Sequence, residues 1–278
     1  MNARTYRDAP TKTIDVGDTT FAYRDNGTAA GVPVIFLNHL AAVLDNWDPR
    51  VVDGIATQHR VITFDNRGVG ASGGKTPTSV AAMADDAIAV IRALGFEQVD
   101  LLGFSLGGMI SQEIAARRPQ LVRKLILAGT GPAGGVGIDK VTRVTLSDTT
   151  RALLTRKDPK ENLFFTTTAN GRAEAKRFIA RLKERTTDRD KSISPIAFRA
   201  QLKAIHAWGV QQPVDLSDIR QPVFVANGDD DRMVPTSNSY DLARRLPNAH
   251  LSIYPDAGHG GIFQFHEQFV AEALEFLR

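Results

Sequence analysis

The sequence predicts an α/β protein: a mostly parallel central sheet flanked by helices, with a helical segment inserted late in the chain. Short, continuously apolar runs recur between residues 32 and 128, and helical patterns separate most of them. Strands that helices bury on both faces have such uninterrupted runs. One run ends on Gly-Phe-Ser-Leu-Gly at residues 103–107, and a helical pattern follows at once. Between residues 132 and 213 the strand pattern stops, and it then resumes.

In the first half of the chain, strands alternate with helices. Residues 13–23 alternate apolar and polar side chains around a Gly-Asp turn, which predicts an antiparallel hairpin at a sheet edge. Ser79 can cap a helix whose apolar side chains recur up to Leu94, and Gly95 can end it. The other predicted strands are 32–37, 61–64, 99–102 and 124–128, and the other helix is 106–118.

The second half begins with the inserted helices. Amphipathic patterns predict helices at 173–182, 196–208 and 266–277, and strands at 222–226 and 250–254. We therefore predict a core domain of residues 1–131 and 214–278 and a helical cap of residues 132–213. An insertion at the carboxyl ends of parallel strands would lie over the place where such sheets bind ligands.

Composition narrows the class of protein. The chain has 278 residues, 42% of them hydrophobic, and a net charge of +3, which is ordinary for a globular domain. The absence of cysteine excludes disulfides, a thiolate nucleophile and cysteine metal sites. The basic residues of 172–191 alternate with acidic ones, so we expect solvated helices there and no nucleic-acid partner. Without an apolar leader or a membrane-length run, we expect a cytoplasmic protein with no membrane partner.

Ser105 is the candidate nucleophile. It lies at the tip of the predicted strand-to-helix turn, where Gly103 and Gly107 leave no side chain between strand and helix. A serine hydroxyl becomes nucleophilic when an imidazole takes its proton and a carboxylate orients that imidazole. In this type of fold the acid and then the histidine follow the serine along the chain, each in a loop after a strand.

His259 is the candidate base, because it lies in a glycine-rich loop after the last predicted strand. His250 lies at the opposite end of that strand, and His206 and His266 fall on predicted helices. Three consecutive aspartates follow the strand 222–226 and offer the acid. We choose Asp231, the aspartate nearest to the Val-Pro at 234–235 where ordered chain resumes, with Asp230 as the alternative and Asp229 the least favoured.

The chain resembles the α/β-hydrolases with a helical cap over almost its whole length. The likeness rests on four motifs in the expected order: the Gly-x-Ser-x-Gly at 103–107, the acid loop 228–235, the Gly-His-Gly at 258–260 and the Asp-x-Arg-Gly-x-Gly-x-Ser at 65–72. The resemblance implies a serine hydrolase that cleaves a small carboxylic ester or lactone through Ser105, His259 and Asp231. It implies no cofactor and no metal, and it leaves the oligomeric state open.

The loop after the strand 32–37 departs from the family pattern. Many members have His-Gly there, whereas this chain has Asn38, His39 and Leu40. The resemblance implies an oxyanion hole made by the backbone N–H groups of Leu40 and Leu106. An Asn-Ser-Leu loop in the enol-lactonase branch is similar in part. For substrate contacts we expect Asn38, His39, Phe104 and Trp208; for His39, packing within the loop is the alternative interpretation and the simpler one.

Other functions compete with ester hydrolysis. The same three residues could serve a cofactor-free perhydrolase or haloperoxidase, a carbon–carbon bond hydrolase, or a ligand-binding receptor with weak turnover. Residues 129–134 match a dinucleotide-binding pattern, and Asp148 stands near the ribose-binding position. Pro132 removes a backbone donor within that pattern, which argues against it. No two histidines have the helical spacing of a metal site.

Overall fold

The computed structural model describes residues 5–27 and 30–278; residues 1–4 and 28–29 of the predicted core domain lie outside this range. In the described part, one sheet has the strand order β1-β2-β4-β3-β5-β6-β7-β8. β1 pairs antiparallel with β2, and β2 with β4, whereas every later pairing is parallel. The strands are β1 (Lys12–Val16), β2 (Thr19–Asn26), β3 (Val34–Leu37), β4 (Val61–Phe64), β5 (Val99–Phe104), β6 (Val122–Ala128), β7 (Val223–Gly228) and β8 (Ala249–Tyr254).

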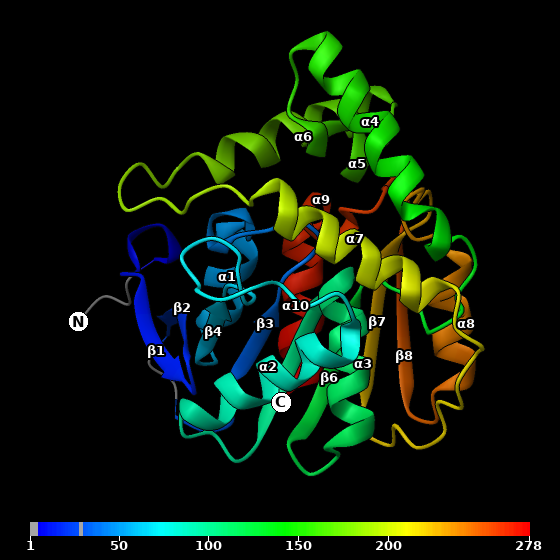
Figure 1. Ribbon diagram of the computed structural model, residues 1–278. Helices are drawn as coiled ribbons and strands as arrows, with labels where there is room; N and C mark the ends of the chain where they lie inside the picture. The colour runs from blue at the N-terminus through cyan, green and yellow to red at the C-terminus, as the bar shows by residue number, and fades with distance from the viewer. Residues whose placement is uncertain (1–4, 28–29) are drawn as a thin grey trace.

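Helices cover both faces of this sheet (Figure 1). Along β3, Ile35 and Leu37 belong to one apolar core, and Val34 and Phe36 belong to the other. Burial on both faces is why the strand is apolar at every position. The first core includes α2 (Val80–Ala93), α3 (Leu106–Arg117) and α8 (Ser237–Arg245), and the second includes α1 (Pro49–Ala56), α9 (Gly261–Gln264) and α10 (His266–Leu277). The predicted α/β class with a mostly parallel, helix-flanked sheet is confirmed.

The predicted edge hairpin forms at β1 and β2, and Ser79 caps α2 by accepting a hydrogen bond from the N–H of Ala82 at 3.3 Å. β5 and β6 are each two residues longer than predicted, at the carboxyl and amino end respectively. The sequence did not predict α4 (Val141–Thr155), α5 (Pro159–Phe164), α8 or the four-residue α9. Short 3-10 helices cover Tyr6–Asp8, Leu44–Asn46 and Ile138–Lys140. Within the described ranges, no helix is long and apolar enough to cross a membrane.

Residues 132–213, called the inserted segment below, connect β6 to β7 and contain α4, α5, α6 (Ala169–Leu182) and α7 (Pro195–Gly209). No strand is found in this described stretch. In Figure 1, α4, α5 and α6 form a separate layer above one end of the sheet, and α7 crosses below them. The inserted segment therefore overlies the end of the sheet from which the loops after β5, β7 and β8 emerge.

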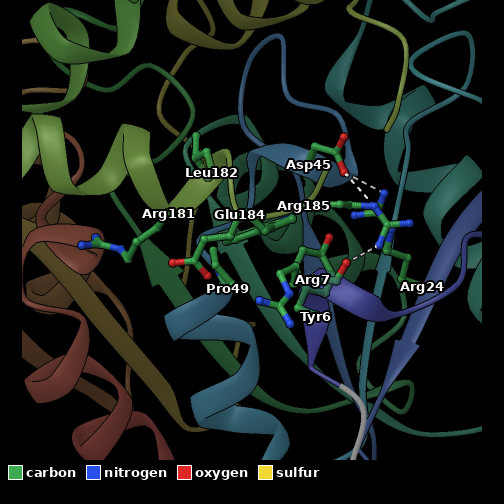
Figure 2. Close-up of a pocket in the computed structure, with 10 residues that line it drawn as sticks. Tyr6, Arg7, Arg24, Asp45, Pro49, Arg181, Leu182, Glu184 and Arg185 are labelled. Atoms are coloured by element: carbon green, nitrogen blue, oxygen red, sulfur yellow. Dashed lines mark hydrogen bonds and ion pairs between the residues drawn. The ribbon is translucent and has the colours of Figure 1, made fainter. Parts of the chain in front are cut away.

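A buried cluster of charges fastens the inserted segment to the sheet (Figure 2). Arg24 on β2 is fully buried, and its Nη2 lies 2.7 Å from Oδ1 of Asp45 and 3.4 Å from Oδ2 of Asp190. Arg185, which follows α6, places Nε 3.6 Å from the same Asp45 carboxylate. Arg181 on α6 forms a second buried ion pair, with Nη2 2.7 Å from Oδ2 of Asp48. These pairs hold α6 and the chain after it against the loop that follows β3.

Candidate active site

Ser105 occupies a strained turn between β5 and α3. Its φ of 57° and ψ of −116° lie outside the regions that ordinary residues favour, so the surrounding structure must hold it there. A Cβ on Gly103 would collide with the backbone of Gly107, and a Cβ on Gly107 would collide with the carbonyl of Leu37. The backbone N–H of Ser105 donates to the carbonyl of Ala128 at 2.9 Å. Glycine on both sides is thus a steric requirement, as the sequence predicts.

His259 and Asp231 are hydrogen-bonded to each other. Nδ1 of His259 lies 2.8 Å from Oδ2 of Asp231, and both side chains are buried. The other carboxylate oxygen accepts hydrogen bonds from the N–H groups of Met233 at 2.8 Å and Val234 at 3.0 Å. Because the carboxylate can only accept, Nδ1 carries a proton, and in the neutral imidazole Nε2 is left as an acceptor. That tautomer can take a proton from a nucleophile.

The other aspartates and histidines that were considered as acid or base lie away from this pair. Asp229 and Asp230 are exposed, and Asp229 accepts a hydrogen bond from the N–H of Ala257 at 3.2 Å. His206 on α7 directs Nδ1 at the carbonyl of Asp139, and His266 begins α10. His250, near the start of β8, packs against Phe224. Of the described histidines, only His39 and His259 line a cavity together with Ser105.

That cavity has a volume of ≈230 Å³ and lies between the sheet and the inserted segment. The core loops supply the residues His39, Leu40, Ala41, Ser105, Met233 and His259. The inserted segment supplies a largely apolar set, namely Thr145, Thr149, Pro159, Lys160, Leu163, Phe164, Ile193 and Phe198. A small, mostly apolar space with a few polar groups is typical of a site for a small molecule.

Residues 39–42 form a tightly constrained loop beside Ser105. Nδ1 of His39 lies 2.8 Å from the carbonyl oxygen of Leu40, and Ala41 has a φ of 64°. The N–H of Ala41 donates at 2.8 Å to Oε1 of Gln201, a buried residue of α7. Side chains from the core and from the inserted segment therefore hold the two ends of one peptide unit. Leu106 is the first residue of α3, where N–H groups lack a partner inside the helix.

Burial keeps His39 neutral. The side chain is 4% exposed, and desolvation lowers its pKa from 6.5 to about 3 against the opposing hydrogen bond to Leu40. The nearby Lys160 and His259 lower the pKa further. Since the ring must donate from Nδ1 to a carbonyl oxygen, Nε2 is an acceptor over the whole range in which proteins ordinarily work.

Asn38, Phe104 and Trp208 are not among the described residues that line the cavity. Asn38 donates to the carbonyl of Phe64 at 3.1 Å and accepts from the indole of Trp47, so both ends of its amide are engaged. Phe104 is fully buried, with its ring 4.9 Å from that of His259. The indole of Trp208 donates to the carbonyl of Gly131 at 3.2 Å. Of the four expected substrate contacts, His39 alone is among the described residues that line the cavity.

The motif at 65–72 supports the same loop from the other side. The carboxylate of Asp65 accepts hydrogen bonds from the N–H groups of Leu44 at 2.9 Å and Ala71 at 3.2 Å. Burial raises the pKa of this carboxyl well above its usual value. A Cβ on Gly70 would collide with the carboxylate of Asp65, which explains the glycine. The role visible for this motif is to shape the chain after β3.

The dinucleotide-binding pattern at 129–134 has no matching architecture. It follows β6, but the next α-helix, α4, begins only at Val141. Gly129 lies against the ring of Phe104, and Asp148 pairs with Arg232. Phosphate binding by such a pattern requires a helix N-terminus directly after the turn, and residues 135–140 separate the two here. Within the described residues, no group of three or more His, Asp or Glu side chains is placed to hold a metal ion.

Comparison with known proteins agrees with this architecture. Residues 32–265 match the alpha/beta hydrolase fold family, and the chain belongs to that family. It is similar to a solved alpha/beta hydrolase fold protein from Chitinophaga pinensis, with a TM-score of 0.93 and 42% identity over 99% of each chain. Over 241 residues it is 32% identical to a Caulobacter sp. (strain K31) protein named "Putative carbamate hydrolase RutD", covering 83% of this chain and 85% of that protein.

The enol-lactonase from Burkholderia xenovorans LB400 has the same fold, with a TM-score of 0.74 and 19% identity over 96% of this chain and 99% of that one. At this identity the likeness concerns the fold alone. The sequence resemblance to the α/β-hydrolases is thereby confirmed at the level of the family.

Proposed function

We propose that the protein is a serine hydrolase that cleaves a small carboxylic ester or lactone through an acyl-enzyme. One observation carries the proposal: His259, hydrogen-bonded at 2.8 Å to the buried Asp231, lines the same cavity as Ser105. A buried carboxylate, an imidazole in the tautomer that it selects and a serine on a strained turn are the parts that acyl transfer requires.

In the first half-reaction, Oγ of Ser105 attacks the substrate carbonyl while its proton passes to Nε2 of His259. Asp231 stabilises the imidazolium that forms. The backbone N–H groups of Leu40 and Leu106 donate to the oxyanion, and each such donor contributes about 2.7–4 kcal/mol. The tetrahedral intermediate then collapses, and His259 gives its proton to the departing alcohol oxygen.

In the second half-reaction, water replaces the alcohol. His259 takes a proton from the water, whose oxygen attacks the acyl carbon, and Ser105 leaves with the proton returned by His259. A lactone follows the same course, except that its alcohol stays attached to the acyl group. One relative is named "Putative carbamate hydrolase RutD", which supports a carbamate as a further candidate acyl donor for this chain.

The inserted segment is proposed to act as the cap of this site, with residues 132–213 as its extent. Its side chains form more than half of the cavity lining, and the ring of Phe164 lies 5.6 Å from that of His259. A largely apolar wall excludes water from the reacting carbonyl and favours an uncharged acyl group.

The experiment that tests the proposed function compares Ser105→Ala with Ser147→Ala. Ser147 is an exposed residue of α4 and does not line the cavity, so its variant controls for the loss of a serine. Ser105→Ala should lower kcat on a short activated ester by about 10⁴-fold or more and abolish labelling by a fluorophosphonate probe. Ser147→Ala should retain both. Folded wild-type protein that neither labels nor turns over such esters would favour a ligand-binding receptor instead.

A further inference from the structure

Two buried polar atoms that belong to cavity-lining residues have no hydrogen-bond partner among the described residues. They are Nε2 of His39, from the loop after β3, and Oγ1 of Thr145, from α4. Both side chains are more than nine-tenths buried. Buried polar atoms in proteins are almost always paired, so an unpaired atom in a binding cavity indicates a group that a ligand supplies.

The chemistry of His39 specifies what that group must be. Its Nδ1 is committed as a donor to the carbonyl of Leu40, which leaves Nε2 without a proton. The ring stays neutral because burial disfavours the charged form. Nε2 can therefore only accept, and a carbonyl, ether or carboxylate oxygen of a ligand would leave it unsatisfied. A hydroxyl or an N–H group would pair with it.

We propose that His39 is a specificity-determining residue, which accepts at Nε2 a hydrogen bond from a hydroxyl or N–H carried by the substrate close to its reacting carbonyl. His39 immediately precedes Leu40 and lines the cavity together with Ser105. The substrate class is thus a hydroxy- or amino-substituted ester or lactone, or a carbamate with a free N–H, in preference to a plain alkyl ester.

The apolar character of the remaining wall strengthens this selection. Leu40, Leu163, Phe164, Phe198 and Met233 offer no hydrogen-bonding side chain, so a ligand donor finds few other partners. Sites built to pair with a substrate hydroxyl discriminate strongly against analogues that lack it, because the protein group is then left buried and unpaired. Thr145 can donate to the same ligand or accept from it.

The inference rests on the proposed function, and its test uses matched substrates. Phenyl hydroxyacetate and phenyl methoxyacetate carry an oxygen at the same position, so the carbonyl is activated similarly, but only the first has a donor. The 3-hydroxy- and 3-methoxypropanoate esters, and 2-hydroxyethyl and 2-methoxyethyl acetates, extend the comparison to other positions. For at least one pair, wild-type kcat/KM should favour the hydroxyl compound by about tenfold or more, equal to about 1.4 kcal/mol.

Two variants of His39 test whether the acceptor at Nε2, and not the bulk of the ring, causes the preference for the hydroxyl compound. In His39→Asn the side-chain amide can donate to the carbonyl of Leu40 in place of Nδ1, but no acceptor reaches the position of Nε2. The hydroxy-to-methoxy ratio should fall towards one, whatever the absolute rates. In His39→Gln the longer amide can present its oxygen near that position, and the ratio should recover at least in part. A ratio that His39→Asn leaves unchanged overturns the proposal.

Failure of the inference and failure of the proposed function give different results. Ser105-dependent hydrolysis of all probes without any hydroxyl preference refutes the inference and leaves the hydrolase proposal standing. If the wild type hydrolyses no probe, calorimetric titration of Ser105→Ala with hydroxyacetamide and methoxyacetamide measures recognition without turnover. Equal dissociation constants for the two amides would then refute the inference as well.

Discussion

The two sides of the cavity differ in how they are built. On the core side, Ser105, Asp231 and His259 come from short loops after β5, β7 and β8, and hydrogen bonds or strained turns fix each of them. On the side of the inserted segment, the lining residues belong to helices and connections, and most of them are apolar. The core side presents groups that can do chemistry, and the inserted segment presents mainly shape.

The difference extends to the way each side is held. In the described residues, the core side is continuous with a sheet whose central strands are buried on both faces. The inserted segment is attached to it through particular contacts, among them the Arg24–Asp190 and Arg181–Asp48 ion pairs and the Gln201–Ala41 hydrogen bond. Changes on the core side should therefore alter reaction rates, and changes at the attachments should alter stability or the alignment of the loop after β3.

The largest expected effect is a loss of kcat caused by a substitution on the core side. Asp231→Asn should lower kcat by about 10⁴-fold, because an amide can donate to Nδ1 of His259 and so favours the wrong imidazole tautomer. Asp230→Asn, a change of the adjacent carboxylate, should leave kcat within about twofold, because that side chain is exposed and the partner of His259 is Asp231. Steady-state kinetics on a short activated ester measure both. The reverse pattern would assign the acid to Asp230.

The next largest effect is a loss of stability caused by removing a buried ion-pair partner. Arg24→Met should lower the free energy of unfolding by about 3–5 kcal/mol, because it removes the nearest cation from the buried carboxylates of Asp45 and Asp190. Arg7→Met is the matched control and should change the free energy of unfolding little, because its pair with Asp8 is about half exposed on both sides and water screens such pairs. Urea denaturation measures both variants. Equal losses would show that the buried cluster does not fasten the inserted segment to the sheet.

The same division explains what could be predicted from the sequence. Strands buried on both faces and the serine turn are local patterns, so the fold and the neighbourhood of Ser105 and His259 follow from short stretches of chain. The direction of Trp208 does not, because it depends on how α7 is rotated against Gly131. α4 was not predicted because its leucines do not lie on one buried face. Leu146, Leu153 and Leu154 are exposed, so the sequence shows no single apolar stripe there. The hydrogen bond between Gln201 and Ala41 joins residues 160 positions apart, and no local sequence pattern predicts it.

That bond provides the smallest and most specific prediction. Gln201→Met keeps the length and burial of the side chain but removes the acceptor for the N–H of Ala41, whose positive φ then lacks its support. Because Leu40 is the neighbouring residue, its N–H should lose alignment with the oxyanion. kcat should fall about tenfold, a fraction of what a complete oxyanion donor contributes, and KM should change little.

A merely structural role for Gln201 would not produce that separation of kcat from KM. Affinity for a boronic acid that forms a tetrahedral adduct with Ser105 should weaken in parallel with kcat/KM, whereas affinity for the carboxylic acid product should not. Gln201→Glu keeps an acceptor oxygen in place and should retain more of the activity than Gln201→Met. If the two variants lose kcat equally, or if KM alone rises, the inserted segment contributes shape to this site but does not align its oxyanion loop.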